Sequence, residues 1–130
     1  MWLDVAHNPG AAAEFAALLE TRPCQGRTLA VYGGMQDKDV EGVARAMAGV
    51  VDRWYPCGIP QDRGLTGEEA AVRLGPRPDR LAGPFPGPGE ALAAARADAR
   101  PGHDRILVFG SFLVVAAVLG AHGSENGARR

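Results

Sequence analysis

An acid, an imidazole and an amide lie close together near the start of the chain, where they could form part of a binding site. Residues Leu3–Pro9 read Leu-Asp-Val-Ala-His-Asn-Pro, a short apolar run that ends in polar side chains. Asn8 is typical of a helix N-cap and Pro9 of a first helical position, so the segment predicts a strand-to-helix junction. A helix start attracts a phosphate or carboxylate, and Asp4 could accept hydrogen bonds from ribose hydroxyls. The same pattern also fits a capped turn with a solvated Asp4 and His7.

Two further polar residues follow later apolar runs. Lys38 is the one lysine among 14 basic residues, the others being arginines, and it lies in the segment Gly33–Asp39, which reads Gly-Gly-Met-Gln-Asp-Lys-Asp. Its ammonium is a compact positive charge that suits a carboxylate. The alternative is a solvated loop lysine, and Asp37 and Asp39 would either orient Lys38 or shape the loop. Ser111 follows the apolar run that ends in Phe-Gly and could cap a helix.

Alternating strands and helices must position these residues. Apolar runs and turn signals predict four strands, over Trp2–Ala6, Thr28–Tyr32, Arg53–Cys57 and Asp104–Phe109, with a further short strand at Arg80–Gly83. Helical spacing predicts helices over Pro9–Arg22, Asp39–Val51, Thr66–Leu74, Glu90–Ala99 and Ser111–Leu119. This alternation predicts an α/β fold, a three-layer Rossmann-like domain whose mostly parallel sheet has helices on both faces.

The predicted topology brings the polar residues to one edge of the sheet. In a parallel sheet, the segments that follow the strands all lie at the carboxyl edge, where open α/β sheets bind ligands. The junctions Asp4–Pro9, Gly33–Asp39 and Gly110–Phe112 should therefore converge. We expect the side chains of Asp4, His7, Asn8, Lys38 and Ser111 to meet there.

Composition sets the bounds of this interpretation. A chain of 130 residues has room for one domain with a real core, and a net charge of −1 with mixed signs gives no basic surface for nucleic acid. The cysteines Cys24 and Cys57 are expected to be free thiols. The apolar stretch Ile106–Leu119 is too short for a membrane span, and no signal peptide is evident. We expect a soluble cytoplasmic domain over residues 1–120 and a disordered tail over 121–130.

Several common catalytic motifs are missing from the sequence. The lysine follows Asp37 and not a glycine, so there is no phosphate loop of the Gly-x-x-x-x-Gly-Lys-Ser/Thr type. There is also no dinucleotide fingerprint after the first predicted strand and no Gly-x-Ser-x-Gly nucleophile motif around Ser111. No metal-ligand spacing is present, and Asp37 with Asp39 is a weak basis for Mg²⁺. The chain thus has some features of a nucleotide-using enzyme but lacks a motif that binds the phosphates.

Three motifs in this order resemble the C-terminal domain of the dihydrofolate synthase/folylpolyglutamate synthase family, which belongs to the Mur ligase superfamily. They are Leu3–Pro9, the segment Val31–Asp39 with its Gly-Gly-Met-Gln-Asp-Lys-Asp loop, and Gly110–Phe112, which reads Gly-Ser-Phe. The resemblance covers Trp2–Leu119, and the Asp-Lys-Asp loop favours the folate branch over the cell-wall branch. It implies a Rossmann-like glutamate ligase domain that closes over a larger ATPase domain.

The resemblance implies an ATP-dependent amide ligase that adds L-glutamate to dihydropteroate or to folates. In the family, the γ-phosphate of ATP passes to a substrate carboxylate, and the glutamate amine then attacks the acyl phosphate. The phosphate loop, the Mg²⁺ ligands and most of the pterin site belong to the ATPase domain. The implied cofactors are therefore ATP and Mg²⁺, and the implied partners are glutamate, a pterin or folate substrate and the ATPase domain. The chain alone is not expected to catalyse ligation.

The resemblance also implies roles for individual residues. Asp4 would contact the ATP ribose, and His7 and Asn8 would lie between the nucleotide and the incoming glutamate, with His7 as the catalytic candidate. Lys38 and Ser111 would hold a carboxylate of the glutamate, and Asn8 would contribute to the same substrate site. An ammonium, a hydroxyl at a helix start and an amide cap together suit an anion, which agrees with these roles.

Two other functions fit the same residues. The chain could be a non-catalytic Rossmann-like binding or regulatory module, or the C-terminal domain of a cell-wall Mur ligase. The sequence is equally compatible with an excised piece of a longer enzyme, a gene fragment or one half of a split enzyme. It does not distinguish dihydrofolate synthase from folylpolyglutamate synthase activity, because the pterin site would lie outside it.

Overall fold

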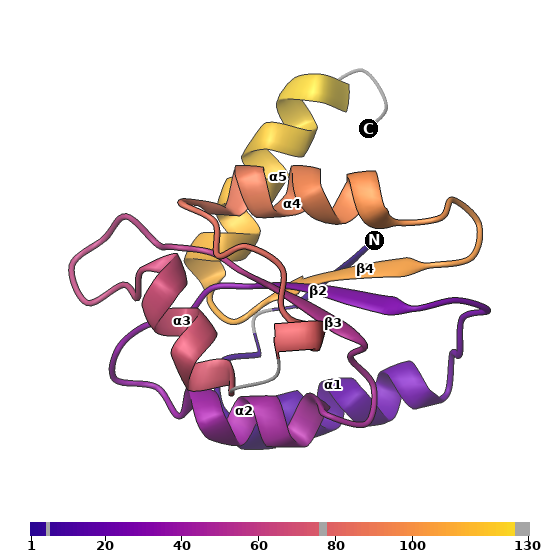
Figure 1. The fold of residues 1–130 in the computed structure, drawn as a ribbon, viewed down its shortest axis with the longest axis horizontal. Helices are drawn as coiled ribbons and strands as arrows, with labels where there is room; N and C mark the ends of the chain where they lie inside the picture. The colour runs from indigo at the N-terminus through magenta and orange to yellow at the C-terminus, as the bar shows by residue number, and fades with distance from the viewer. Residues whose placement is uncertain (5, 76–77, 127–130) are drawn as a thin grey trace.

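A four-stranded parallel sheet forms the centre of the molecule (Figure 1). The computed structural model describes residues 1–4, 6–75 and 78–126. The strands are β1 (Trp2–Leu3), β2 (Thr28–Tyr32), β3 (Arg53–Pro56) and β4 (Arg105–Phe109). Their order is β1-β4-β2-β3, and every neighbouring pair is parallel. The predicted parallel sheet is confirmed.

Helices cover both faces of this sheet, as the predicted three-layer fold requires. They are α1 (Pro9–Glu20), α2 (Val40–Met47), α3 (Gly67–Leu74), α4 (Pro88–Asp98) and α5 (Phe112–Asn126), with a short 3₁₀ helix η1 (Pro78–Arg80). Figure 1 shows α1 and α2 below the sheet and α4 and α5 above it. Within the described residues, none of these helices is both long and apolar enough to cross a membrane.

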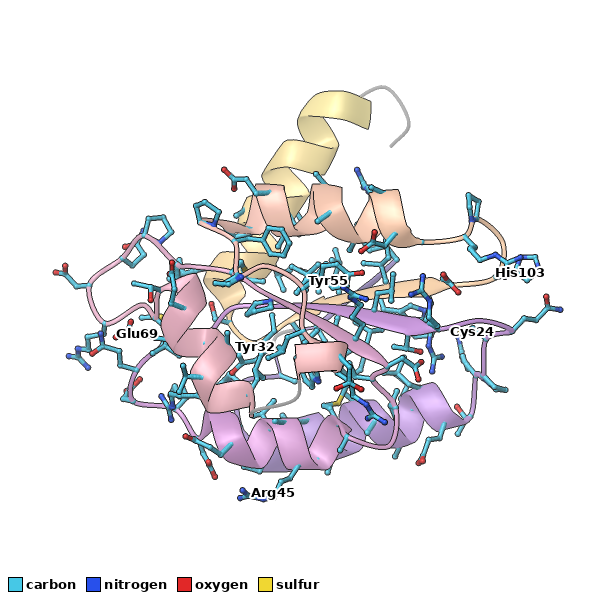
Figure 2. The ribbon with its side chains drawn as sticks, viewed as in Figure 1. Cys24, Tyr32, Arg45, Tyr55, Glu69 and His103 are labelled. Atoms are coloured by element: carbon cyan, nitrogen blue, oxygen red, sulfur yellow. The ribbon has the colours of Figure 1, made fainter. Side chains whose placement is uncertain are left out.

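The core consists of two apolar layers because successive strand residues point to opposite faces. Tyr32 faces α1 and α2, where it joins a cluster of aromatic rings, with centroids 5.9 Å from Trp54 and 5.4 Å from Phe109. Tyr55 lies on the other face, and its ring stacks on Phe85 at 6.2 Å. Figure 2 shows Tyr32 and Tyr55 on opposite sides of the sheet. Burial of both layers makes the sheet a rigid support for the loops at its edges.

Most differences from the predicted elements lie at their ends, but one predicted strand does not form. The segment Arg80–Gly83, a predicted strand, contains the end of η1 and a single bridge from Leu81 to Trp54, so that prediction is wrong. Helix α5 continues past Leu119 to Asn126 and includes Gly120 and Gly123, since each glycine costs a helix only about 1 kcal/mol. Residues 127–130 lie outside the described part, and the domain boundary at residue 120 stays a prediction.

Candidate functional site

The predicted convergence of the three strand-to-helix junctions occurs at the carboxyl edge of the sheet. The Asp4 amide donates to the Val108 carbonyl at 3.1 Å, which ties the first junction to β4. The Gly33 amide donates to the Phe109 carbonyl at 3.4 Å, which ties the second junction to the same strand. Gly110 has a φ of 116°, and a Cβ there would collide with the Gly33 carbonyl oxygen. Only glycine permits this approach of the second and third junctions.

Asp4 and Asn8 shape the first junction through their side chains. One Asp4 carboxylate oxygen accepts the Ala6 amide at 2.8 Å. Asn8 Oδ1 accepts the Ala11 amide at 2.9 Å and caps α1, which begins at Pro9 as predicted. Asp4 and His7 are half-buried. A second carboxylate oxygen remains on Asp4, which is the chemistry needed to accept a hydrogen bond from a ribose hydroxyl.

Lys38 lies in the second junction, directly before α2. Asp39 caps that helix, since its Oδ1 accepts the Gly42 amide at 2.9 Å, so Asp39 shapes the loop. A Cβ on Gly42 would collide with Pro9, which places the starts of α1 and α2 side by side. Lys38 is half-buried, and among the described residues its ammonium forms no ion pair. The cation is thus available to a ligand.

Ser111 caps the helix of the third junction. It is 6% exposed, and its Oγ accepts the amides of Leu113 at 3.0 Å and Val114 at 3.4 Å. Accepting two amides leaves the hydroxyl proton free to donate, as a hydrogen bond to a carboxylate requires. A Cβ on Gly33 would collide with Val114, so the first turn of α5 lies against the start of the Lys38 loop.

An open hollow of about 630 Å³ lies between the Lys38 loop and α5. Met35 of that loop and Leu113 of α5 line it, together with the segment 59–66 that follows β3. The hollow is large enough for an amino acid. Met35 belongs to the second junction and Leu113 follows the third, but neither Lys38 nor Ser111 is among the residues that line it. The contribution of segment 59–66 could not be predicted from the sequence, because Gln61 and Asp62 belong to no recognisable motif.

Two other side chains at this edge escaped sequence reasoning. Arg73 of α3 donates hydrogen bonds to the carbonyls of Gln36 and Lys38, which lie 37 and 35 residues earlier in the sequence. Tyr32 is fully buried under Gly34, and its hydroxyl has no hydrogen-bond partner among the described residues. Burial raises the pKa of Tyr32 far above its usual value, so this phenol stays neutral. Neither residue lies in a motif, and only the folded contacts identify them.

The arrangement suits anion binding better than acid–base chemistry. A lysine ammonium, a serine hydroxyl and the starts of three helices present positive charge and hydrogen-bond donors at one edge of the sheet. No group of three His, Cys, Asp or Glu side chains that could hold a metal ion occurs among the described residues. The described residues therefore do not provide a set of ligands for the Mg²⁺ that the resemblance implies.

The sequence and the fold are both similar to those of known ligases. The profile of the family described as Mur ligase, glutamate ligase domain, matches residues 1–112. The chain is 40% identical over 116 residues to dihydrofolate synthase/folylpolyglutamate synthase of Escherichia coli, a match that covers 89% of this chain and 26% of the relative. The corresponding protein of Haemophilus influenzae is 32% identical over 117 residues, which covers 88% of this chain and 26% of the relative.

Solved structures show the same similarity. The E. coli FolC structure in complex with DHPP and ADP superimposes with a TM-score of 0.85 at 37% identity, over 94% of this chain and 28% of that one. A bifunctional folylpolyglutamate synthase/dihydrofolate synthase with Mn, AMPPNP and L-glutamate bound gives a TM-score of 0.79 at 33% identity, over 92% and 28%. This chain spans about a quarter of the length of these relatives.

Proposed function

Because this chain belongs to the Mur ligase family as a glutamate ligase domain, we propose that it supplies the glutamate side of an ATP-dependent ligase. Its substrates would be L-glutamate and a dihydropteroate or folate carboxylate, as the names of its relatives suggest. Since the chain spans about a quarter of those relatives, a larger ATPase part would bind the phosphates and Mg²⁺.

The observation that carries this proposal is the convergence, at one edge of the sheet, of the three strand-to-helix junctions that contain Asn8, Lys38 and Ser111. The free ammonium of Lys38 and the hydroxyl proton of Ser111 would bind a glutamate carboxylate. Holding the glutamate there leaves its amine free to attack an activated carboxylate bound by the ATPase part. Positioning of this kind can supply several kcal/mol of the barrier reduction.

The nucleotide would lie against the first junction. We propose that the free carboxylate oxygen of Asp4 accepts a ribose hydroxyl, and that His7 and Asn8 lie between the nucleotide and the glutamate. The relatives solved with ADP or AMPPNP support nucleotide use in the family. His7 would act as the residue nearest the reacting groups, and the half-buried position of its side chain keeps it accessible from this edge.

The alternatives fit the observations less well. A cell-wall ligase domain would share this fold, but the two relatives named above, at 40% and 32% identity, are dihydrofolate synthase/folylpolyglutamate synthases. A non-catalytic module would have no need for an unpaired lysine beside a capping serine at the ligand-binding edge. Two free cysteines are consistent with a reducing compartment, and we propose the cytoplasm.

A chimeric enzyme tests the proposal. In the E. coli relative, residues 2–119 of this chain would replace the matching C-terminal part, and Lys38→Ala would be introduced into the chimera. We expect ligation by the chimera, and a rise of about tenfold or more in the KM for glutamate in the variant, with the KM for ATP unchanged. Arg45→Ala, which removes an exposed cation from α2, is the control. An inactive but folded chimera, or an unchanged glutamate KM and turnover in Lys38→Ala, would contradict the proposal.

A further inference from the structure

We propose that Arg73 is a positioning residue that holds the Lys38 loop in its glutamate-binding conformation. This inference rests on the proposed function, because it gives Arg73 a role only through Lys38. Arg73 lies on α3, which is separate in sequence from every junction at the carboxyl edge. It would not touch the substrate.

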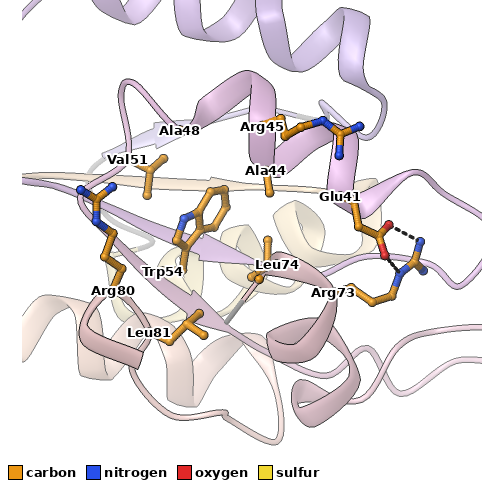
Figure 3. Close-up of a pocket in the computed structure, with 11 residues that line it drawn as sticks. Glu41, Ala44, Arg45, Ala48, Val51, Trp54, Arg73, Leu74, Arg80 and Leu81 are labelled. Carbon is orange, nitrogen blue, oxygen red and sulfur yellow. Dashed lines mark hydrogen bonds and ion pairs between the residues drawn. The ribbon is translucent and has the colours of Figure 1, made fainter. Parts of the chain in front are cut away.

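Four hydrogen bonds from one guanidinium carry the inference. Nη1 donates to the Gln36 carbonyl at 3.0 Å, and Nη2 donates to the Lys38 carbonyl at 2.7 Å. Nε and Nη2 also donate to the two carboxylate oxygens of Glu41, at 3.2 and 3.0 Å. One side chain therefore joins the residues on both sides of Asp37 to the first turn of α2. Figure 3 shows Arg73 and Glu41 paired in this way.

Only an arginine could make this set of contacts. Its planar guanidinium has five donors in a fixed arrangement, whereas a lysine offers one ammonium on a flexible stem. The contacts to Gln36 and Lys38 fix two backbone carbonyls, and so fix the direction in which the chain leaves Lys38. A lysine at position 73 could pair with Glu41 but could not reach both carbonyls at the same time.

The charge of Arg73 is already balanced within the chain. Its ion pair with Glu41 is bidentate, and hydrogen bonding to Arg73 lowers the pKa of Glu41, which keeps that carboxylate ionised. A guanidinium engaged in this way is a poor partner for a substrate carboxylate. Lys38, which forms no ion pair among the described residues, remains the cation that the glutamate can use.

Backbone hydrogen bonds hold the loop as well. The Gln36 amide donates to the Arg63 carbonyl at 2.7 Å, and the Leu65 amide donates to the Gly34 carbonyl at 3.0 Å. These bonds hold the residues that precede Asp37. Arg73 is the side chain that reaches past them to Lys38, so its loss should loosen the loop at the lysine while the rest of the loop stays attached.

A double-mutant cycle in the chimera tests this role. Arg73→Gln and Arg73→Lys are each expected to raise the KM for glutamate by about tenfold, with the KM for ATP within about twofold of the parent. In the Lys38→Ala background the same changes should add almost nothing, because Arg73 acts through Lys38. Arg45→Gln, which changes an exposed arginine one turn after Glu41 on α2, is the matched control and should leave both constants unchanged.

The outcomes separate this inference from the proposed function. If Lys38→Ala raises the glutamate KM and Arg73→Lys does not, the role of Arg73 is wrong and the proposed function stands. If Lys38→Ala itself has no effect, the proposed function fails first. Effects of Arg73→Lys that add fully to those of Lys38→Ala would also overturn the inference. Thermal melting of the full chain identifies global damage, and Arg73→Lys is expected to melt within a few degrees of the parent because it keeps the charge pair with Glu41.

Discussion

At the residue scale, the polar side chains at the carboxyl edge of the sheet are of two kinds: some stabilise the fold, and others have groups available to bind a ligand. Asn8 and Asp39 each use a side-chain oxygen to cap a helix, so they set the geometry of the junctions. Lys38 keeps its ammonium unpaired among the described residues, and Ser111 keeps its hydroxyl proton after accepting two amides. Lys38 and Ser111, which the resemblance assigns to a glutamate carboxylate, thus both retain a donor that a ligand could use.

Tyr32 gives a prediction that concerns stability alone. Its buried hydroxyl has no hydrogen-bond partner among the described residues, so removing it leaves no other group unsatisfied. We expect Tyr32→Phe to change the free energy of unfolding by less than about 1 kcal/mol, or to stabilise the chain slightly. Tyr55→Phe is the matched comparison, because the Tyr55 hydroxyl donates to Asp98 at 2.6 Å and should be costlier to lose. Urea denaturation of both variants measures the difference, and a larger loss for Tyr32→Phe would contradict the expectation.

At the scale of elements, capping residues made the helix starts predictable from sequence. Thr66 and Glu69 form the predicted capping box, with reciprocal bonds of 3.1 and 2.9 Å at the start of α3. Asn8 and Ser111 also cap their helices as predicted. Caps are local, so a few residues decide them. The contacts of Arg73 depend on how α3 packs beside α2, and this packing cannot be predicted from a local sequence pattern.

The end of α5, unlike the helix starts, could not be predicted from the sequence. The small and polar residues after Leu119 predict the end of the helix there, yet α5 continues to Asn126. A run of small residues weakens a helix without stopping it, since a single glycine costs about 1 kcal/mol. Capping residues mark the helix starts in the sequence, whereas only a lower helix propensity marks the end of α5.

The cap of α5 leads to a prediction about Ser111. Ser111→Ala removes the acceptor of two buried amides, so we expect a loss of about 1 kcal/mol in the free energy of unfolding. Ser111→Thr keeps the acceptor and should recover most of the stability. In the chimera, Ser111→Ala should also raise the KM for glutamate, because the hydroxyl proton is lost with the oxygen. Chemical denaturation and steady-state kinetics give the two readouts, and a fully stable Ser111→Ala chain would show that the cap is unimportant.

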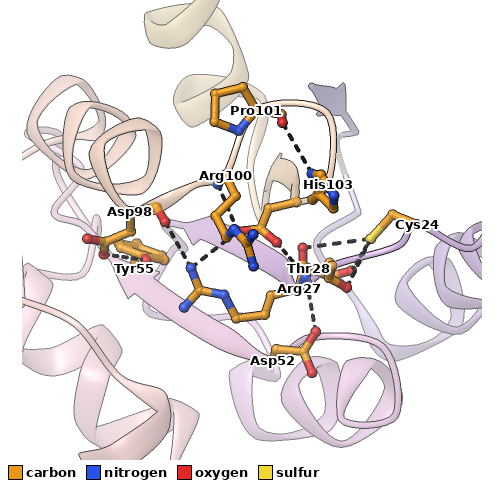
Figure 4. Close-up of polar contacts among 11 residues, drawn as sticks. Cys24, Arg27, Thr28, Asp52, Tyr55, Asp98, Arg100, Pro101 and His103 are labelled. Atoms are coloured by element: carbon orange, nitrogen blue, oxygen red, sulfur yellow. Dashed lines mark hydrogen bonds and ion pairs between the residues drawn. The ribbon is translucent and has the colours of Figure 1, made fainter.

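At the scale of the whole molecule, the two edges of the sheet have different roles. The amino edge carries a polar network that joins β2, β4 and α4, which Figure 4 shows around Arg27 and Thr28. Arg27 pairs with Asp104 at 3.2 Å and donates to the Asp98 carbonyl at 2.8 Å, and the Thr28 amide donates to Asp52 at 2.7 Å. These bonds lie at the opposite ends of the strands from Lys38. The Arg27–Asp104 ion pair therefore lies away from the candidate binding edge, whereas the Arg73–Glu41 ion pair lies beside the Lys38 loop.

Asp104 makes the stability of the chain sensitive to acid. Backbone hydrogen bonds from Arg100 and Arg27, and then the Arg27 side chain, lower the pKa of Asp104 below its usual value. A carboxylate with a lowered pKa in the folded state stabilises the fold above its unfolded pKa, and that stability is lost as the pH falls through the folded pKa. We expect Asp104→Asn to lower the Tm near neutral pH.

The same variant should approach the parent at low pH. Below about pH 4 the Asp104 carboxyl begins to protonate in the unfolded chain, so the difference in Tm between parent and Asp104→Asn should shrink. Melting curves of both chains across the acid range measure it. Other carboxylates, including Glu41, titrate in both chains and cancel in the difference. A difference that stays constant down to about pH 2 would contradict this assignment.

The most direct test of the central claim uses the full chain and L-glutamate. We expect a titration followed by ¹H–¹⁵N NMR to show saturable shifts at Asn8, Lys38 and Ser111, with weak, millimolar affinity because the ATPase part would complete the site. The amides of Arg27 and Asp104, at the amino edge, should not move, and Lys38→Ala should abolish the shifts. Shifts confined to the amino edge, shifts that survive Lys38→Ala, or no shifts at the carboxyl edge would contradict the assignment of this edge to glutamate.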